Sequence, residues 1–263
     1  MGAPPRPVTR EDGALVPEPV LSVVIPVFNE ENHLPEVVER LFASPCPIAR
    51  EWIFVDDASA DGSPAILDGL AERDDVTVIH QAVNGGKGSA VRAGFEAARG
   101  DFVMVQDADL EYDPADVPKL LAPLIADEAD VVFGSRFRAD RVQVHRTFHY
   151  LGNRLLTDLS NLASGIYLSD METCYKIFRA DLIKPMRLRS QRFGFEVEST
   201  AYVAKTTARI FELPISYTPR TRLAGKKIGW RDGVAALWHI VHFNLLTRES
   251  QAFRGLPERY RVT

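Results

Sequence analysis

Cysteine is scarce in this sequence, since only Cys46 and Cys174 occur among 263 residues. The two are far apart and show no metal-ligand spacing, so a disulfide or a metal site is disfavoured and two reduced thiols are expected. Long apolar runs are also missing, because none reaches the ~18 residues that a membrane-spanning helix needs. Residues 1–19 contain five prolines and no apolar core, so we expect a disordered tail rather than a signal peptide.

The sequence lacks an excess of positive charge as well, with a net charge of -5 at pH 7. A basic surface for nucleic acid is therefore not expected, and we predict no nucleic-acid partner. The charge is unevenly spread, however, because residues 220–263 contain nine Lys or Arg and three Asp or Glu. A basic C-terminal stretch on an acidic body predicts a local anionic partner.

Two nucleotide-binding signatures are absent. The Gly-rich stretch NGGKGSAVRAG matches neither G-x-G-x-x-G nor the Walker pattern G-x-x-x-x-G-K-[ST], which disfavours a nicotinamide-dependent enzyme. Gly85, Gly86 and Gly88 still permit close approach of the backbone to a ligand, and Lys87 suits a phosphate or a carboxylate. A plain turn before a helix is the simpler interpretation of the same residues.

The sequence does contain short apolar runs that alternate with amphipathic segments. Strands are expected at 20–28, 51–57, 76–81, 101–109, 129–136 and 209–220, and helices at 29–44, 61–74, 84–100 after its Gly-rich start, 113–127, 145–165, 192–208 and 233–246. Such alternation forms βαβ units on a mostly parallel sheet. The predicted fold is therefore α/β, with a doubly wound sheet in a three-layer α/β/α arrangement and a ligand crevice at the carboxyl ends of the strands.

Four acids follow one of these strands: Asp107, Asp109, Glu111 and Asp113 come directly after the apolar run 102–105. Two carboxylates one residue apart can both reach one cation where a strand breaks into a turn. Oxygen ligands suit Mg²⁺ or Mn²⁺, and such an ion takes further ligands from water and substrate phosphates. A solvated acidic loop is the alternative, which a position at the ligand-binding edge makes less favourable.

Five stretches in fixed order, VVIPVFNEE, VDDASADGS, NGGKGSAVRAGF, QDADLEYDP and GSR, together resemble the family 2 nucleotide-sugar glycosyltransferases, which have the GT-A fold. The resemblance covers residues 20–246. DMETCYKIFR and YTPRTRLAGKKIGWRDG resemble in particular the polyprenyl-phosphate hexose synthases of the dolichyl-phosphate mannose or glucose type. The resemblance implies metal-dependent, inverting transfer of a hexose from a nucleoside-diphosphate sugar to a polyprenyl phosphate.

The resemblance also assigns roles to individual residues. Nucleotide-sugar binding is implied for Pro26, Val27, Asn29, Glu30, Asp57, Lys87, Gly88, Asp107 and Ala108. Binding of Mg²⁺ or Mn²⁺ is implied for Asp107, Asp109 and Glu111, although this branch often has Gln at the last position. Asp113 precedes Pro114 and is expected to cap the following helix instead.

The acceptor decides which catalytic groups are needed. A phosphate monoester already carries roughly -1.5 to -2 charge near neutral pH, so it needs cations to hold it rather than a general base. The candidate cations are Arg136, Arg146, Arg220, Arg222, Lys226 and Lys227, and Arg136 ranks first because it ends a strand. A hydroxyl acceptor would need a base, for which Asp170 is the first candidate and Glu172 the second. Orienting the acceptor cations and capping a helix are equally good interpretations of Asp170.

The domain organisation follows the resemblance. We expect one catalytic domain over 20–246, with a nucleotide-binding half at 20–139 and an acceptor-binding half at 140–246, followed by a tail at 247–263. The apolar helix 233–246 is ~21 Å long, too short to span a bilayer, and with Trp238 it suits a membrane interface. Packing on the sheet is the alternative, and helix 145–165 is a second candidate surface. We expect a cytoplasmic protein that is peripheral at the inner membrane surface, and self-association is left open.

Other functions are less favoured. UDP-glucose is preferred as the donor over GDP-mannose because GKKIGWRDG resembles the glucosyl branch. A family 2 enzyme that acts on a sugar or small-molecule hydroxyl is the main alternative. A nucleotidyltransferase would usually carry a Gly-rich basic loop after its first strand, and PVFNEEN has none. A non-catalytic nucleotide-binding module is disfavoured because metal acids and acceptor cations occur together.

Overall fold

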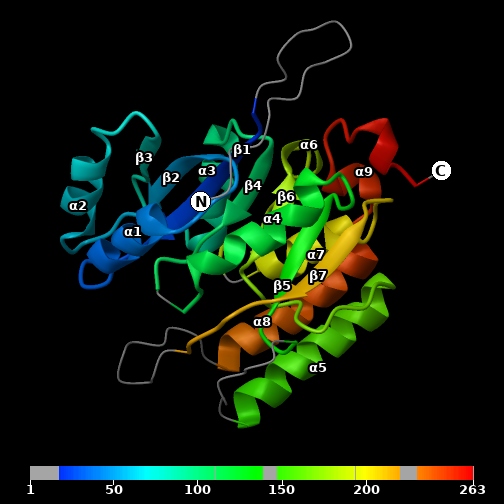
Figure 1. Cartoon of the computed structure of the whole chain (residues 1–263). Coiled ribbons are helices and arrows are strands. Elements are labelled where there is room, and N and C mark those ends of the chain that lie inside the picture. Colours follow the sequence, from blue (N-terminus) through cyan, green and yellow to red (C-terminus); the bar gives the residue numbers. More distant parts are fainter. Residues whose placement is uncertain (1–17, 110, 139–146, 193, 220–229, 263) are drawn as a thin grey trace, which may run out of the picture.

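The computed structural model describes residues 18–109, 111–138, 147–192, 194–219 and 230–262. Within them, seven strands form one sheet in the order β3-β2-β1-β4-β6-β5-β7 (Figure 1). The strands are β1 (Val20–Val27), β2 (Ala49–Asp56), β3 (Val76–His80), β4 (Phe102–Val105), β5 (Val131–Ser135), β6 (Lys176–Arg179) and β7 (Ile210–Pro214). Only β6 runs antiparallel to its neighbours, β4 and β5. The mostly parallel α/β sheet predicted from the sequence is confirmed.

The strand order reverses after β3, because β4 pairs with the free side of β1. With right-handed crossovers, this reversal places α1 (Leu34–Ala43) and α2 (Ser63–Leu70) on one face of the sheet and α3 (Lys87–Ala97) on the other. Ligands of doubly wound sheets bind where the order reverses. The expected binding edge therefore lies at the carboxyl ends of β1 and β4.

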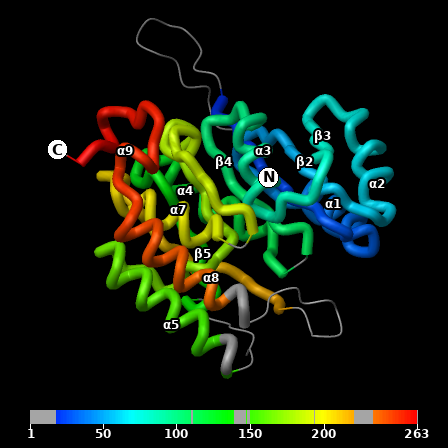
Figure 2. The backbone as a smooth tube through the Cα atoms, turned by 180° about the vertical axis from the view of Figure 1, so that it is seen from behind, coloured from blue at the N-terminus to red at the C-terminus, as the bar shows by residue number. Residues whose placement is uncertain are grey.

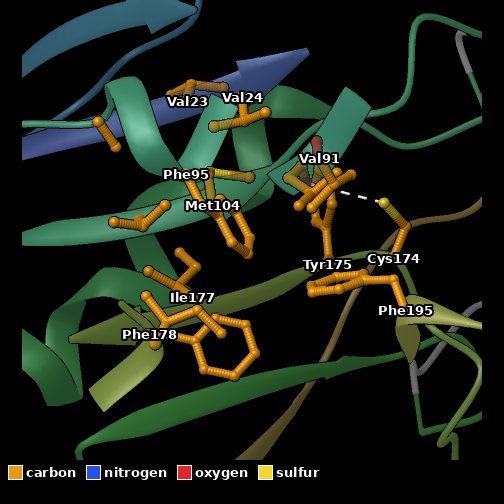
Figure 3. Close-up of a cluster of buried hydrophobic side chains, with 14 of the residues drawn as sticks. Val23, Val24, Val91, Phe95, Met104, Cys174, Tyr175, Ile177, Phe178 and Phe195 are labelled. Carbon is orange, nitrogen blue, oxygen red and sulfur yellow. Dashed lines mark hydrogen bonds between the residues drawn. The ribbon is translucent and has the colours of Figure 1, made fainter. Parts of the chain in front are cut away.

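The core forms where α3 and α7 meet the sheet. Val24 of β1, Met104 of β4 and Ile177 of β6 are fully buried and lie close to Phe95 of α3 (Figure 3). The ring of Phe95 meets that of Phe195 at a centroid distance of 5.6 Å. Burying a side chain of this size contributes roughly 1.5–3 kcal/mol. Apolar runs with β-branched residues thus form central strands because both of their faces are covered.

Among the described residues after β4, helical segments outnumber strands. Those up to residue 246 are η1 (Pro114–Asp116), α4 (Val117–Ile125), α5 (Thr147–Ser164), α6 (Ala180–Ile183), α7 (Phe195–Val203), α8 (Trp230–Val241) and the π-helix η3 (His242–Leu246). Helices α5 and α8 pack side by side at the edge of the molecule (Figures 1 and 2). Strand β6 was not predicted, because its four residues are specified by pairing with β4 and β5 rather than by local periodicity.

The C-terminal segment packs against the domain over its described part, residues 247–262. It contains α9 (Glu249–Ala252) and η4 (Glu258–Tyr260). Tyr260 is 1% exposed, and its carbonyl accepts a hydrogen bond from the Thr207 amide at 3.0 Å. Phe253 forms an isolated bridge with Met186. The sequence predicted a tail here, because isolated apolar residues without periodicity do not reveal a tertiary docking surface.

Candidate functional site

The loop after β1 is tied to the loop after β2. Asn29 has a positive φ of 52°, and its side-chain oxygen accepts a hydrogen bond from the Ala60 amide at 2.8 Å. The Asn29 amide donates to Ser59 Oγ at 3.0 Å, and the Glu30 amide donates to Ser63 Oγ at 3.0 Å. Asn and Asp tolerate positive φ better than other side chains with a Cβ, which explains Asn at this turn. These contacts shape the loop that the sequence assigned to the base and ribose.

Asp57 connects the strand ends to the Gly-rich loop. Its amide donates to the Val27 carbonyl at 2.8 Å, and its carboxylate accepts from the amides of Gly85 and Gly86, each at 2.8 Å. Pro26 is half-buried and Val27 buried in the adjacent strand. Asp57 therefore holds the Gly-rich loop in place. Each oxygen of the Asp57 carboxylate can accept a second hydrogen bond. Recognition of the base by Asp57 is thus compatible with these contacts and stays a prediction.

The Gly-rich loop approaches another backbone closely, as its glycines predicted. A Cβ at Gly88 would overlap the Ser190 carbonyl, and the Gly88 amide donates to the Arg192 carbonyl at 3.2 Å. Gly86 has a φ of 80°, a backbone angle that residues with a side chain rarely adopt. The described partner of this close approach is the segment around 190–192, on which the start of α3 is docked.

Lys87 lies between two carboxylates. Its ammonium is 2.8 Å from Asp107 Oδ1 and 2.8 Å from Glu196 Oε1. Burial alone would lower the pKa of Lys87, but Asp107 and Glu196, together with Cys174, hold it well above its usual value. The carboxylate partners of Lys87 in this structure come from the chain itself, so its contact with a bound ligand stays a prediction. Glu196, at the start of α7, was not among the predicted site residues.

The acids of the metal prediction have separate partners. Asp107 faces Lys87, Asp109 Oδ1 accepts from the Glu111 amide at 3.1 Å, and the Glu111 carboxylate accepts a short hydrogen bond from the Tyr217 hydroxyl. Over the described part of the chain, no three His, Cys, Asp or Glu side chains are grouped as a ready metal site. The donor set still fits a hard divalent ion, because Mg²⁺ and Mn²⁺ bind one or two carboxylates and complete their coordination with phosphates and water.

The two remaining residues of this stretch to which the sequence assigned a role are Ala108 and Asp113. Ala108, which was assigned to the donor site, is buried at 4% exposure. Asp113 Oδ1 accepts from the Ala115 amide at 3.0 Å and caps the short helix η1. The predicted capping role of Asp113 is therefore confirmed.

Arg136 and Asp170 form a bidentate ion pair at the carboxyl end of β5. Arg136 Nε and Nη2 each donate to the Asp170 carboxylate at 2.7 Å, and the Arg136 amide donates to it at 3.0 Å. Asp170 is fully buried. Burial would lower the pKa of Arg136, but Asp170 keeps it well above its usual value. With three donors already bound, Asp170 is placed to orient Arg136, which was one of the interpretations left open.

Glu212 of β7 joins this cluster through the backbone next to Asp170. Its carboxylate accepts from the amides of Ser169 and Asp170 at 2.8 and 3.1 Å and lies 3.2 Å from the Arg138 guanidinium. Sequence reasoning missed Glu212. A carboxylate inside an otherwise apolar strand, RIFELP, was the available signal, since a buried acid needs partners.

Glu172 differs from the other acids. Among the described residues, its Oε1 is buried without a hydrogen-bond partner. Burial, then repulsion from Glu196, raises the pKa of Glu172 to about 7. Nearby Lys176 is fully buried and donates to the carbonyls of Met171 and Glu196, each at 2.9 Å. Burial lowers the pKa of Lys176 to about 8. A carboxyl group that titrates near neutrality is suited to proton transfer.

Several predicted acceptor residues lie outside the described residues. They are Arg146, Arg220, Arg222, Lys226 and Lys227. Of the predicted acceptor cations, Arg136 is the one that the structure places.

The family comparison gives a clear result. A family model described as Glycosyl transferase family 2 matches residues 22–186. The chain is 33% identical to the undecaprenyl-phosphate 4-deoxy-4-formamido-L-arabinose transferase of Proteus mirabilis over an alignment of 205 residues. This alignment covers 76% of this chain and 60% of that protein. It is 31% identical over 209 residues to the dodecaprenyl-phosphate galacturonate synthase of Rhizobium johnstonii, covering 76% and 59%. The chain thus spans less than two thirds of the length of these relatives.

Solved structures share the fold. Glucosyl-3-phosphoglycerate synthase from Mycobacterium tuberculosis, in complex with Mn²⁺ and uridine-diphosphate-glucose, aligns with a TM-score of 0.63. The alignment has 17% identity and covers 86% of this chain and 79% of that chain. This likeness concerns the arrangement of helices and strands and confirms the predicted fold.

Proposed function

This chain belongs to glycosyl transferase family 2, and we propose that it moves a hexose from a nucleoside-diphosphate sugar to a polyprenyl phosphate with inversion. Both curated relatives described above are named for transfer to, or synthesis on, a polyprenyl phosphate. UDP-glucose is the donor that the sequence favours. Mg²⁺ or Mn²⁺ is the proposed cofactor, in keeping with the Mn²⁺ found with a nucleotide sugar in the structurally similar enzyme.

One observation carries this proposal. The acids Asp107 and Asp109 lie at the carboxyl end of β4, and the cation Arg136 lies at the carboxyl end of β5. Since β6 alone separates β4 from β5, these two acids and Arg136 share one edge of the sheet, which supports their proposed roles in binding a metal ion and a phosphate. A donor diphosphate and an acceptor phosphate require this combination of charges.

The chain's own residues would act mainly by electrostatics. When bound, the divalent ion would offset the charge that builds on the leaving diphosphate. Asp107 and Asp109 would hold that ion, and Lys87 would lie beside the diphosphate as a further cation. Asp57 fixes the Gly-rich loop that presents Lys87. The acceptor phosphate needs no base, so Arg136, oriented by Asp170, would hold it in line for attack.

A second candidate function is favoured by Glu172. A hydroxyl acceptor would need a general base, and the raised pKa of Glu172, about 7, suits that role. Asp170 is less suited, because Arg136 occupies its carboxylate. Loss of transfer in Glu172→Gln, with transfer intact in Arg136→Lys, would favour this second function.

We also propose that the enzyme works at a membrane surface. No helix among the described residues has the length and apolarity to cross a bilayer. Helices α5, α8 and η3 nevertheless expose a row of large apolar side chains, here called the apolar face. Its members are Leu151, Leu155, Leu159, Leu162, Val234, Leu237, Trp238, Val241, Leu245 and Leu246.

A lipid bilayer is the occupant that best fits the apolar face. Its residues recur at helical spacings of three and four on two adjacent helices, which is typical of an interfacial surface. Trp238 is 58% exposed, and such aromatic rings favour the boundary between lipid and water. The sequence just before the two helices, 141–146 and 220–227, contains six Arg or Lys, which complement anionic lipids. A lipid-linked acceptor would then reach the catalytic edge from the same bilayer.

The central test is a transfer assay. The protein would be incubated with UDP-glucose, GDP-mannose and other nucleotide sugars, with Mg²⁺ or Mn²⁺, and with polyprenyl phosphate in detergent or vesicles. We expect a lipid-linked hexose from one donor, none in EDTA, and none with Asp109→Ala of unchanged circular dichroism. Unchanged donors throughout the panel would overturn the proposal, and transfer to a soluble sugar alone would favour the second function.

A further inference from the structure

Helix α7 carries two acids, Glu196 and Glu198, that hold the surroundings of the Gly-rich loop. Glu198 is fully buried and accepts from the amides of Arg189 and Ser190 at 2.7 and 2.9 Å and from Ser190 Oγ at 2.7 Å. It therefore fixes the segment on which the Gly-rich loop is docked. These three donors belong to this segment, so Glu198 supports its structure.

Glu196 lies two residues before Glu198 on α7 and faces Lys87 instead. Its Oε1 binds the Lys87 ammonium at 2.8 Å, and the same ammonium lies 2.8 Å from Asp107 Oδ1. The three side chains are largely withdrawn from solvent, with Glu196 at 7% exposure. The ammonium thus occupies one side of a carboxylate that, under the proposed function, must also bind a divalent ion.

We propose that Glu196 is a positioning residue that draws the Lys87 ammonium away from Asp107 when the metal and diphosphate bind. This inference rests on the proposed function. A divalent ion on Asp107 repels a nearby ammonium, and the ammonium needs another anion, because an unpaired charge is costly at a buried site. Glu196 supplies that anion without any movement of the backbone, since it already contacts Lys87.

The same contacts determine which oxygens the Lys87 ammonium can reach. Once a metal ion occupies Asp107, the ammonium held by Glu196 would lie beside the metal acids, where it can meet the diphosphate oxygens. Without Glu196, Asp107 is the remaining carboxylate partner of Lys87 and is less available to the metal. Glu196 therefore sets the balance between an ammonium and a metal ion that compete for one carboxylate.

The test measures metal binding directly. Mn²⁺ binding to the full chain would be followed by the electron paramagnetic resonance signal of free Mn²⁺, with UDP present and no acceptor. We expect Glu196→Gln to weaken Mn²⁺ binding about tenfold, as expected for loss of one charge-assisted hydrogen bond. Lys87→Met should bind Mn²⁺ at least as tightly as the wild type but UDP more weakly. The double variant Lys87→Met/Glu196→Gln should regain wild-type Mn²⁺ affinity.

A matched variant separates this inference from a general effect of charge. Glu196→Asp keeps the negative charge near the metal but is one methylene too short to hold Lys87 in place. Weakening close to that of Glu196→Gln would support the inference, and wild-type affinity in Glu196→Asp would overturn it. Glu128→Gln, at an exposed position at the amino end of β5, removes a charge far from the site and should change nothing.

The outcomes also separate this inference from the proposed function. A wild-type chain that binds neither Mn²⁺ nor UDP would overturn both. A wild type that binds both ligands, with Mn²⁺ affinity unchanged in Glu196→Gln, would overturn only the role of Glu196. In that case the contact between Lys87 and Glu196 would be a structural tie between α3 and α7.

Discussion

At the scale of single residues, the buried acids near the catalytic edge differ in what they contact. Asp170 faces a guanidinium, Glu198 faces backbone amides, Glu196 faces an ammonium, and Glu172 has a buried oxygen without a hydrogen-bond partner among the described residues. A buried carboxylate is stable when it is paired and changes its pKa when it is not. Their partners therefore distinguish the acids that hold neighbouring groups in place from Glu172, whose pKa is raised to about 7.

The first residue-scale prediction concerns Asp170. Asp170→Asn should lower the free energy of unfolding by about 3 kcal/mol, because it leaves the largely buried Arg136 without its anion. Urea unfolding followed by circular dichroism measures this change. A general base without a structural role would show the opposite pattern, with stability unchanged and activity lost.

The second residue-scale prediction concerns pH. The pKa of Glu172 is about 7 in the folded protein and near 4.5 when exposed, so the folded state binds the extra proton between these values. The stability that Glu172 contributes is thus fully present below pH ~4.5 and is lost as pH rises through ~7. The side chain of Glu172→Gln cannot ionise, so the variant does not lose this stability. At pH 8 it should be more stable than the wild type, by at most about 3 kcal/mol.

The measurement is thermal or urea unfolding of both proteins at pH 5 and pH 8. The stability difference between variant and wild type should grow from pH 5 to pH 8. An equal difference at both pH values would mean that Glu172 is already ionised in the folded protein at pH 5.

At the scale of elements, the packing of α3 on β1 depends on a glycine. A Cβ at Gly94 would overlap Val24 Cγ1, so α3 lies closer to β1 than any side chain allows. This close approach also brings the first turn of α3, with Lys87, to the carboxyl ends of the strands. The position of a site residue is therefore set by a contact two turns further along the same helix.

Gly94→Ala tests this packing. Ala favours a helix interior by about 1 kcal/mol over Gly, but overpacking costs about 1–3 kcal/mol, so we expect a net loss of about 1 kcal/mol of stability. Gly69 in α2 is the matched control, because a Cβ there would meet nothing within 4 Å. Gly69→Ala should be neutral or stabilising. Urea unfolding compares the two, and equal effects would mean that α3 moves freely on the sheet.

At the scale of the whole molecule, the catalytic edge and the apolar face belong to one body. Strands β5 and β7 run parallel and end at the catalytic edge. The segments that follow these two strands lead directly into α5 and α8, which carry the apolar face. An enzyme that rests on a bilayer through this face would keep its catalytic edge near the lipid headgroups.

Vesicle flotation tests this arrangement. Wild-type protein should float with vesicles that contain phosphatidylglycerol, and Trp238→Gln/Leu245→Gln should remain in the lower fraction with its fold intact. Ile125→Gln is the control, because Ile125 is 42% exposed on α4, away from the apolar face. Equal flotation of all three proteins would mean that the apolar face is not the membrane contact, and a wild type that does not float would contradict a membrane role. A mass that doubles in the wild type alone would assign the face to a second copy of the chain.

The sequence alone determined six of the seven strands of the sheet, its mostly parallel character and the acids at its carboxyl edge. Local periodicity specifies buried strands, and the topology of βαβ units then gathers their ends, so Asp57, Lys87, Asp107 and Arg136 could be placed together. The roles implied by family resemblance for Asn29, Glu30 and Asp57 remain predictions, although the structure places all three in the loops at this edge.

Only the tertiary structure decided which charges meet. Glu196 is far from Lys87 in the chain, and nothing in the sequence pairs it with Lys87 rather than with any other cation. The same holds for Glu212 beneath Asp170, for β6 between β4 and β5, and for the docked C-terminal segment. Periodicity is a local property, whereas the partner of a buried charge depends on which elements pack together. The sequence therefore predicted the edge at which the proposed site residues gather, and the fold determined the pairing of their charges.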